Sequence, residues 1–311
     1  MRAESDVVRA HREAGRFFEA CGTRSFLREA GEGQAVLCMH GVPASCFLYR
    51  KVIDELASRG LHGIAFDLPG LGLAARPADF DYTWSGLGRF CRAAVDALGI
   101  GRFHLVVHDI GGPVGFELAA GMPDRVLSLT LLNTIVAVES FQRPWSMQPF
   151  AMRGLGWLWL RGLTRYSFRA IMALQGIQDH SATPSSELDA YVELLKREDS
   201  GRAFLEIMRG FERTAEKQAL YEGAVRGAPY PVQVIWGAMD PALRLVRYGE
   251  EARQIAGVDS LHALPAKHFL QEDQAPAIGA LVAGLAGVAR TGDRSAPPPS
   301  LDGPGGGVPA R

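Results

Sequence analysis

The sequence predicts an α/β protein with a mostly parallel sheet, helices on both faces and a helical insertion. Two observations carry this prediction. Strand-like segments alternate with helical patterns along most of the chain, and the alternation stops between residues 135 and 226. Alternation of this kind is typical of parallel sheets, because parallel strands need crossover connections. The predicted strands are 35–39, 63–66, 103–107, 126–132, 232–236 and 260–264.

We expect the chain to divide into a core, a cap and a tail. The core comprises residues 16–134 and 227–290. Residues 135–226 form the helical cap, whose aromatic side chains would enclose an apolar pocket over the strand ends. Residues 291–311 are rich in Pro and Gly and predict a disordered tail. The cap aromatics are Phe141, Trp145, Phe150, Trp157, Trp159 and Tyr166.

Composition favours an ordinary globular protein that acts on a small molecule. Of 311 residues, 47% are hydrophobic and 22% are charged. Lys and Arg total 33 against 34 Asp and Glu, so no global field attracts nucleic acid or an anionic membrane. We therefore expect a small apolar substrate as the partner. Nothing in the composition predicts an oligomeric state.

The compartment is predicted from cysteine usage and from the N-terminal residues. The four cysteines show no CxxC spacing, which favours free thiols and argues against a disulfide framework or a zinc site. Residues 1–15 are polar and lack the apolar stretch of a signal peptide. The apolar run 278–289 is too short to cross a bilayer. We expect a cytoplasmic protein without a membrane span, metal or cofactor.

Asp109 is the most informative residue, because it follows the predicted strand 103–107 and precedes Gly111 and Gly112. These glycines would let the chain turn tightly from strand into helix. Hydrolases usually carry a serine at such an elbow. A carboxylate nucleophile instead forms an alkyl ester, which predicts displacement of a leaving group from an sp3 carbon. The alternative is that Asp109 only caps the following helix.

Three further motifs also follow predicted strands. His40 begins a His-Gly-Val-Pro turn after strand 35–39. Asp240 follows strand 232–236 and is suited to orient a histidine by accepting its Nδ1 hydrogen. His268 follows strand 260–264 and is the best candidate base, since the other histidines lack a comparable motif. The order nucleophile, acid, base is that of the hydrolase elbow signature.

Together these motifs resemble the α/β-hydrolase superfamily over about residues 16–288. The similarity is to its aspartate-nucleophile branch, which contains haloalkane dehalogenases and epoxide hydrolases. The resemblance implies an α/β-hydrolase fold. It also implies a triad and an oxyanion hole, formed by Asp109, Asp240 and His268 and by the backbone N–H groups of Val42 and Ile110.

The position of the acid has an alternative within this branch. In some dehalogenases the acid follows the strand after the elbow helix, and Asn133 stands there in this chain. An amide cannot carry the negative charge, which favours Asp240. Glu139, six residues further on, is a weaker substitute.

The leaving group depends on donors that the core motifs do not provide. A halide needs N–H donors, and dehalogenases usually place a Trp directly after the nucleophile. This chain has Ile110 there and Val42 after the His-Gly turn, and neither side chain can donate a hydrogen bond. We therefore expect donors from the cap. The candidate indoles are Trp145, Trp157 and Trp159.

An epoxide would need an acidic O–H, usually from cap tyrosines. Phe211 stands where one such tyrosine is expected, so Tyr166, Tyr191 and Tyr221 remain as candidates. The segments 43–53 and 268–276 are more similar to dehalogenases. A haloalkane dehalogenase, which converts a haloalkane and water to an alcohol and a halide, is therefore the favoured prediction.

Two other functional hypotheses stay open. One is an epoxide hydrolase that forms vicinal diols, and the other is a non-catalytic protein that kept the fold. If the protein is a dehalogenase, a haloacid substrate is disfavoured. Fluoroacetate-type dehalogenases hold the substrate carboxylate with arginines just after the nucleophile, where this chain has Pro113 and Val114.

Overall fold

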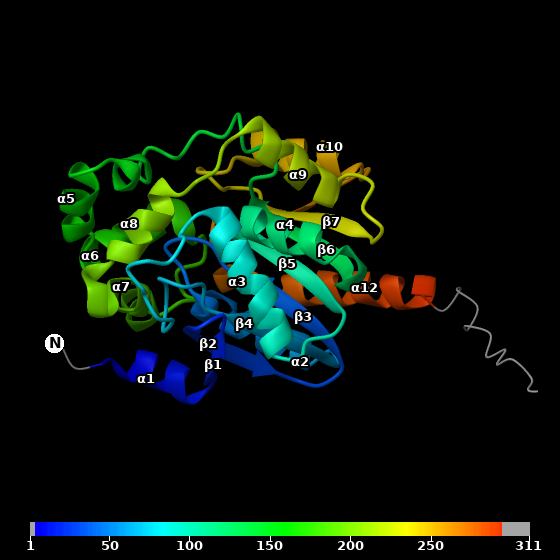
Figure 1. The fold of residues 1–311 in the computed structure, drawn as a ribbon, viewed down its shortest axis with the longest axis horizontal. Helices are drawn as coiled ribbons and strands as arrows, with labels where there is room; N and C mark the ends of the chain where they lie inside the picture. The colour runs from blue at the N-terminus through cyan, green and yellow to red at the C-terminus, as the bar shows by residue number, and fades with distance from the viewer. Residues whose placement is uncertain (1–3, 294–311) are drawn as a thin grey trace, which may run out of the picture.

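The structure is a computed structural model that describes residues 4–293 (Figure 1). Within this range the strands form an eight-stranded sheet in the order β1-β2-β4-β3-β5-β6-β7-β8. The six strands from β3 to β8 are parallel, whereas β2 pairs in antiparallel fashion with β1 on one side and with β4 on the other. The bounds are β1 (Arg16–Ala20), β2 (Thr23–Ala30), β3 (Gln34–Met39), β4 (Leu61–Phe66), β5 (Phe103–Asp109), β6 (Val126–Thr134), β7 (Val232–Gly237) and β8 (His262–Leu264).

The predicted α/β fold and its six parallel strands are confirmed, but sequence reasoning missed β1 and β2. These two strands are joined by Cys21 and Gly22, both with positive φ, at 40° and 73°. Two positive φ angles are what a tight hairpin turn of matching twist requires. Cys-Gly lacks the Asn or Asp that usually marks such a turn, so the hairpin carries no strong sequence signal.

Helices cover both faces of the sheet (Figure 1). On one face α2 and α12 pack against each other and against β4 and β6, and on the other α3, α4, α9 and α10 form the layer. Because both faces are covered, β5 and β6 are buried almost completely, including their polar residues. The bounds are α2 (Arg50–Ala57), α3 (Trp84–Ala97), α4 (Gly111–Gly121), α9 (Ala215–Val225), α10 (Glu250–Ala256) and α12 (Ala275–Asp293).

The segment between β6 and β7 contains the helices that we expected to form the cap. Four of them gather at one end of the molecule (Figure 1): α5 (Leu155–Gly162), α6 (Arg165–Ile171), α7 (Ser185–Ser200) and α8 (Arg202–Arg209). The fifth helix, α9, returns to the core layer. Its Tyr221 ring lies 5.8 Å from that of Phe116 on α4, and Lys217 forms an ion pair with Glu117. The helical segment thus contains both cap and core elements.

Both ends of the described chain are helical. At the start, α1 (Asp6–Glu13) is capped by Ser5 and buries Val8 and His11. At the other end α12 continues to Asp293, past the predicted start of the tail at residue 291, and residues 294–311 lie outside the described part. No helix in the described range combines the length and apolar character needed to cross a membrane.

Candidate active site

Asp109 ends β5 in a strained conformation that turns its side chain out of the sheet. Its φ is 54°, an angle that costs free energy for a residue with a Cβ. Thr134, at the end of β6, donates its hydroxyl to the Asp109 carbonyl oxygen at 2.6 Å and helps to hold the turn. The strained residue is therefore anchored to the neighbouring strand.

The two glycines after Asp109 act differently from our prediction, because neither has a positive φ. They are needed for close packing at the start of α4. A Cβ on Gly111 would lie 2.4 Å from the Met39 carbonyl oxygen, and one on Gly112 would lie 1.8 Å from the Thr134 hydroxyl. The turn is made by Asp109, and the glycines let the helix approach β3 and β6.

The His-Gly-Val-Pro turn places a backbone donor on the Asp109 carboxylate. The Val42 amide donates to Asp109 Oδ1 at 2.8 Å. Gly41 permits this approach, since a Cβ there would lie 2.2 Å from the same oxygen. His40 is buried and holds the turn, because its Nε2 accepts from the Leu68 amide at 3.0 Å while its Nδ1 contacts the Gly41 carbonyl at 2.9 Å.

The structure brings the other two predicted triad residues to the same place. His268 Nε2 lies 3.5 Å from Asp109 Oδ2, and His268 Nδ1 lies 2.8 Å from Asp240 Oδ2. Asp240 is buried, and its Oδ1 accepts from the backbone amides of Ala242 at 2.7 Å and Leu243 at 3.0 Å. These bonds fix the carboxylate so that Oδ2 faces the imidazole.

Asn133 supports Asp240, a role that sequence reasoning missed. Its Nδ2 donates to Asp240 Oδ2 at 2.7 Å, and its Oδ1 accepts from the Gly237 amide at 2.8 Å. The Gly237 bond orients the amide so that the NH2 group faces the carboxylate. Asn133 thus helps to fix the position of the Asp240 carboxylate. Glu139, the weaker candidate for the acid, is solvent-exposed.

The charges in the site depend on one another. Burial favours neutral His268, but the carboxylates of Asp240 and Asp109 outweigh burial and raise the pKa of His268 to about 10. Burial likewise opposes the charge of Asp109, yet contacts with His268 and the Ile110 amide hold its pKa below the usual value. If an ester formed on Asp109, His268 would lose one of the two negative charges that raise its pKa. An imidazole in that state releases its proton more readily and can act as a base.

This coupling predicts the ionisation of the free protein. We expect 15N NMR to show a His268 imidazolium at pH 8, well above the ordinary histidine pKa of about 6.5. Because the folded pKa is raised, the stability due to this proton is complete below about pH 6.5 and is lost as the pH rises through about 10. In Asp109→Asn the pKa of His268 should be lower, because one of the two carboxylates that raise it is gone. An imidazole already neutral at pH 7 in the unmodified protein would contradict the prediction.

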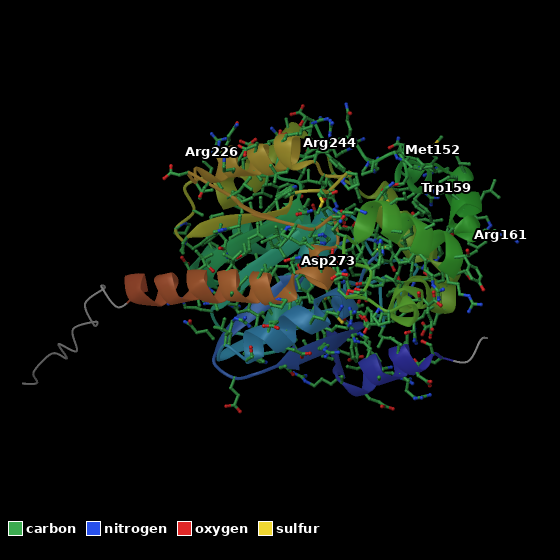
Figure 2. All side chains as sticks on the ribbon, turned by 180° about the vertical axis from the view of Figure 1, so that it is seen from behind. Met152, Trp159, Arg161, Arg226, Arg244 and Asp273 are labelled. Atoms are coloured by element: carbon green, nitrogen blue, oxygen red, sulfur yellow. The ribbon has the colours of Figure 1, made fainter. Side chains whose placement is uncertain are left out.

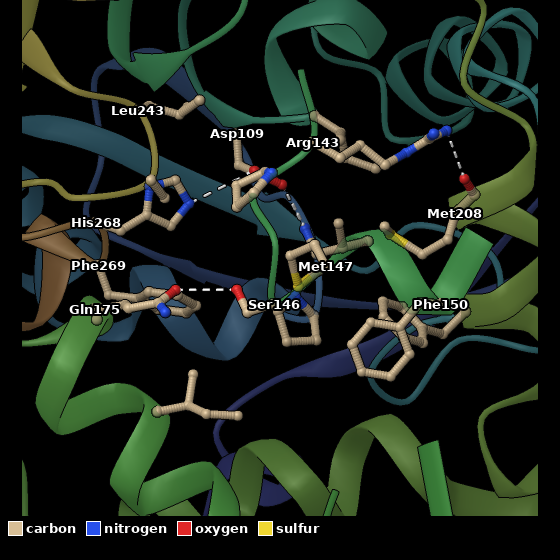
Figure 3. A pocket seen from close by; sticks show the side chains of 18 of the residues that line it. Asp109, Arg143, Ser146, Met147, Phe150, Gln175, Met208, Leu243, His268 and Phe269 are labelled. Atoms are coloured by element: carbon tan, nitrogen blue, oxygen red, sulfur yellow. Dashed lines mark hydrogen bonds and ion pairs between the residues drawn. The ribbon is translucent and has the colours of Figure 1, made fainter. Parts of the chain in front are cut away.

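A pocket of about 90 Å³ adjoins Asp109 and His268 (Figure 3). Its lining is mostly apolar, but Arg143, Ser146 and Gln175 add polar side chains. The Ser146 hydroxyl donates to Gln175 Oε1 at 3.1 Å, so the Gln175 NH2 group keeps its N–H donors for another partner. Apolar lining residues include Ile110, Phe141, Met147, Phe150, Leu163, Phe168, Met172, Phe204, Met208, Phe211, Leu243 and Phe269.

Gln175 lies on a π-helical segment, η4 (Met172–Gly176), that docks on the His268 loop. Its carbonyl accepts from the His268 amide at 3.3 Å, and the Gly176 carbonyl accepts from the Phe269 amide at 2.8 Å. Lys267 Nζ donates to the Ala173 carbonyl at 2.7 Å. Segments of this kind occur often at functional sites. No periodicity in the sequence marked this one.

The structure corrects the expectation for the cap aromatics Trp145, Trp157, Trp159 and Tyr166. None of them lines the pocket, and their exposed fractions are 73%, 45%, 43% and 65%. Trp159 lies on the outer part of the cap (Figure 2) and donates its indole N–H to the Ser146 carbonyl at 3.2 Å. For Trp157 and Trp159 the reason is the orientation of α5, which buries Gly156 and Leu160 and turns the two indoles outward.

Comparisons with known proteins agree with this architecture. A family model described as "alpha/beta hydrolase fold" matches residues 34–275. A haloalkane dehalogenase of Mesorhizobium japonicum is 30% identical over 288 residues, covering 84% of this chain and 87% of the relative. The crystal structure of haloalkane dehalogenase DbeA from Bradyrhizobium elkani superposes with a TM-score of 0.72 and 24% identity, covering 89% of this chain and 99% of that one. The structure of epoxide hydrolase CorEH gives 0.71 and 22%, covering 88% and 98%.

Fold and site together define a capped α/β enzyme of the hydrolase class. The chain belongs to the α/β-hydrolase fold family, because the family model spans well over half of its residues. Its relatives include a haloalkane dehalogenase, a member of the branch that the sequence motifs predicted, and the epoxide hydrolase structure shares the fold.

Proposed function

We propose that the protein is a haloalkane dehalogenase-like hydrolase in which Asp109 is the nucleophile. A carboxylate oxygen of Asp109 attacks the substrate carbon, the carbon–halogen bond breaks, and the halide leaves with the bonding electron pair. Water then attacks the carbonyl carbon of the alkyl ester while His268 takes its proton. The products are an alcohol, a halide and a proton. The observation that carries this proposal is a carboxylate beside an apolar pocket, held by the Val42 amide and 3.5 Å from His268.

The remaining residues have supporting roles in this mechanism. Asp240 orients His268 and stabilises the imidazolium that forms. The amides of Val42 and Ile110 stabilise the oxyanion when water attacks the ester, and loss of one such donor typically costs about 3 kcal/mol of barrier. No metal or cofactor takes part in these steps.

The pocket lining favours a halide over an epoxide as the reacting group. Gln175 brings N–H donors to the pocket, whereas no tyrosine of the described chain lines it. Tyr191 and Tyr221, two of the candidate ring-opening phenols, are buried and donate to Glu272 and Glu117 instead. Tyr166 lies on the surface. An epoxide hydrolase would need an acidic O–H that this pocket does not offer.

Trapping of the ester tests the proposal. We expect His268→Gln to form the alkyl ester but to fail to hydrolyse it. Intact-mass spectrometry after incubation with 1-bromohexane, 6-bromohexanoate and 1,2-epoxyhexane would identify the added group. A bromide-free alkyl adduct supports dehalogenation, whereas an epoxide adduct retains the whole mass of the substrate.

Two controls make the trapping result specific. His262→Gln changes a surface histidine and should turn over substrate without accumulating an adduct. Asp109→Asn should abolish labelling. Absence of any adduct, or labelling that persists in Asp109→Asn without prior deamidation, would show that Asp109 is not the nucleophile.

A further inference from the structure

Arg143 is a half-buried cation in the wall of the apolar pocket. It lies between β6 and α5, and its Nη2 donates to the Met208 carbonyl at 2.9 Å. The guanidinium carbon lies 4.5 Å from the centre of the Phe211 ring. Its Nε is buried and has no hydrogen-bond partner in the described chain. A buried charged donor without a partner lowers the stability of the folded protein. A purely structural role for Arg143 therefore does not explain why Nε has no partner.

Among the described residues, a second arginine and no neutralising acid affects the charge of Arg143. Burial, followed by repulsion from Arg213, lowers the pKa of Arg143 to about 10. Arg213 itself donates to the Phe141 carbonyl at 2.9 Å. In the described chain the hydrogen bonds of both arginines go to backbone carbonyls and not to carboxylates. An anion bound at the Arg143 guanidinium would offset both the cost of burying its charge and its repulsion from Arg213.

The direction of the side chain shows which part of a substrate it can reach. Arg143 extends toward Met208 and turns its guanidinium away from Asp109 (Figure 3). It is therefore poorly placed to hold a halide at the carbon that Asp109 attacks. The side chains of Met147 and Phe150 also line the pocket and offer apolar contact to a short methylene chain.

We propose that Arg143 binds a carboxylate at the far end of the substrate, so that the preferred substrates are short ω-halocarboxylates. This inference rests on the proposed function for the reacting end and adds the recognition of the other end. It replaces the sequence-based view that haloacids are disfavoured. That view considered only the positions just after the nucleophile, whereas this arginine comes from the segment that leads into the cap.

Equilibrium binding of non-reactive product analogues tests the proposal. We expect the full chain to bind 6-hydroxyhexanoate about 10- to 100-fold more tightly than 1-hexanol in calorimetry at pH 7.5, the range for a hydrogen bond to a charged group. Arg143→Gln lacks the charge and should abolish the preference. Arg143→Lys should retain part of it. Arg161→Gln removes an exposed cap charge (Figure 2) and should leave the preference unchanged.

The outcomes separate recognition from chemistry. Equal binding of the two analogues to the unmodified protein overturns the proposal, as does an equal loss of preference in Arg161→Gln. If Arg143→Gln unfolds at a lower temperature yet keeps the preference, Arg143 is structural and the proposal fails. Binding does not require reaction, so a carboxylate preference without an Asp109 adduct contradicts the proposed function alone. An adduct without the preference contradicts only the role of Arg143.

Discussion

Replacing Asp240 with Asn is expected to lower kcat by about 10⁴-fold while the protein stays folded. The carboxylate accepts four N–H groups, since Oδ1 faces the amides of Ala242 and Leu243 and Oδ2 faces Asn133 and His268. The NH2 group of an asparagine must face one of these donor pairs. If it faces His268, the Nδ1 hydrogen of His268 loses its acceptor. If it faces Ala242 and Leu243, the backbone amides of these two residues lose theirs. Steady-state kinetics would measure the loss, and intact-mass spectrometry should show accumulation of the ester.

Glu139→Gln is the matched control for the acid. Glu139 is solvent-exposed, so its replacement should leave kcat within about twofold of the unmodified protein, as is usual for surface changes. If Glu139→Gln caused the larger loss, the acid would be Glu139 and the role of Asp240 would be wrong.

Replacing Glu272 with Leu is expected to lower the free energy of unfolding by about 3–5 kcal/mol, the range for breaking a buried ion pair. Glu272 is buried and pairs with Arg50, at 2.6 Å, and with Lys51, at 2.8 Å. The hydroxyls of Tyr191 and Thr183 also donate to it, at 2.5 and 3.1 Å. Removal of the carboxylate leaves the buried Tyr191 phenol without its acceptor and leaves the Arg50 guanidinium with Glu187 as its remaining carboxylate partner. Urea unfolding would measure the change.

Two further variants separate the buried pair from a general charge effect. Arg226→Gln removes an exposed charge (Figure 2) and should change stability by less than about 0.5 kcal/mol. The double variant Arg50→Met/Glu272→Leu removes both buried charges and should be more stable than Glu272→Leu alone. A single-variant loss below about 1 kcal/mol would show that the network contributes little.

The Glu272 network also links the base to the cap. Glu272 lies four residues after His268 on α11 (Leu270–Asp273), and Tyr191 belongs to α7 of the cap. Weakening of this contact therefore affects both the loop that carries the base and the helix that covers the pocket. We expect kcat to fall in Glu272→Leu as well, although less than in Asp240→Asn.

Local patterns were sufficient for the parallel core and for the positions of Asp109, Asp240 and His268. Asp109 ends β5, and Asp240 and His268 lie a few residues after β7 and β8. The carboxyl ends of parallel strands meet at a common edge of the sheet, so topology alone brings such residues close together. The β1–β2 hairpin was missed because its Cys-Gly turn carries no strong local signal.

The tertiary structure decided which side chains reach the substrate. The sequence shows that α5 is rich in Trp, but contacts with the rest of the cap select the face it buries, and those contacts turn Trp157 and Trp159 outward. Long-range contacts likewise place Arg143 in the pocket and bring Asn133 to Asp240, 107 residues away. Helical periodicity and strand position are local properties of a sequence. The direction of a loop or cap side chain depends on packing between distant segments, and only the folded chain determines it.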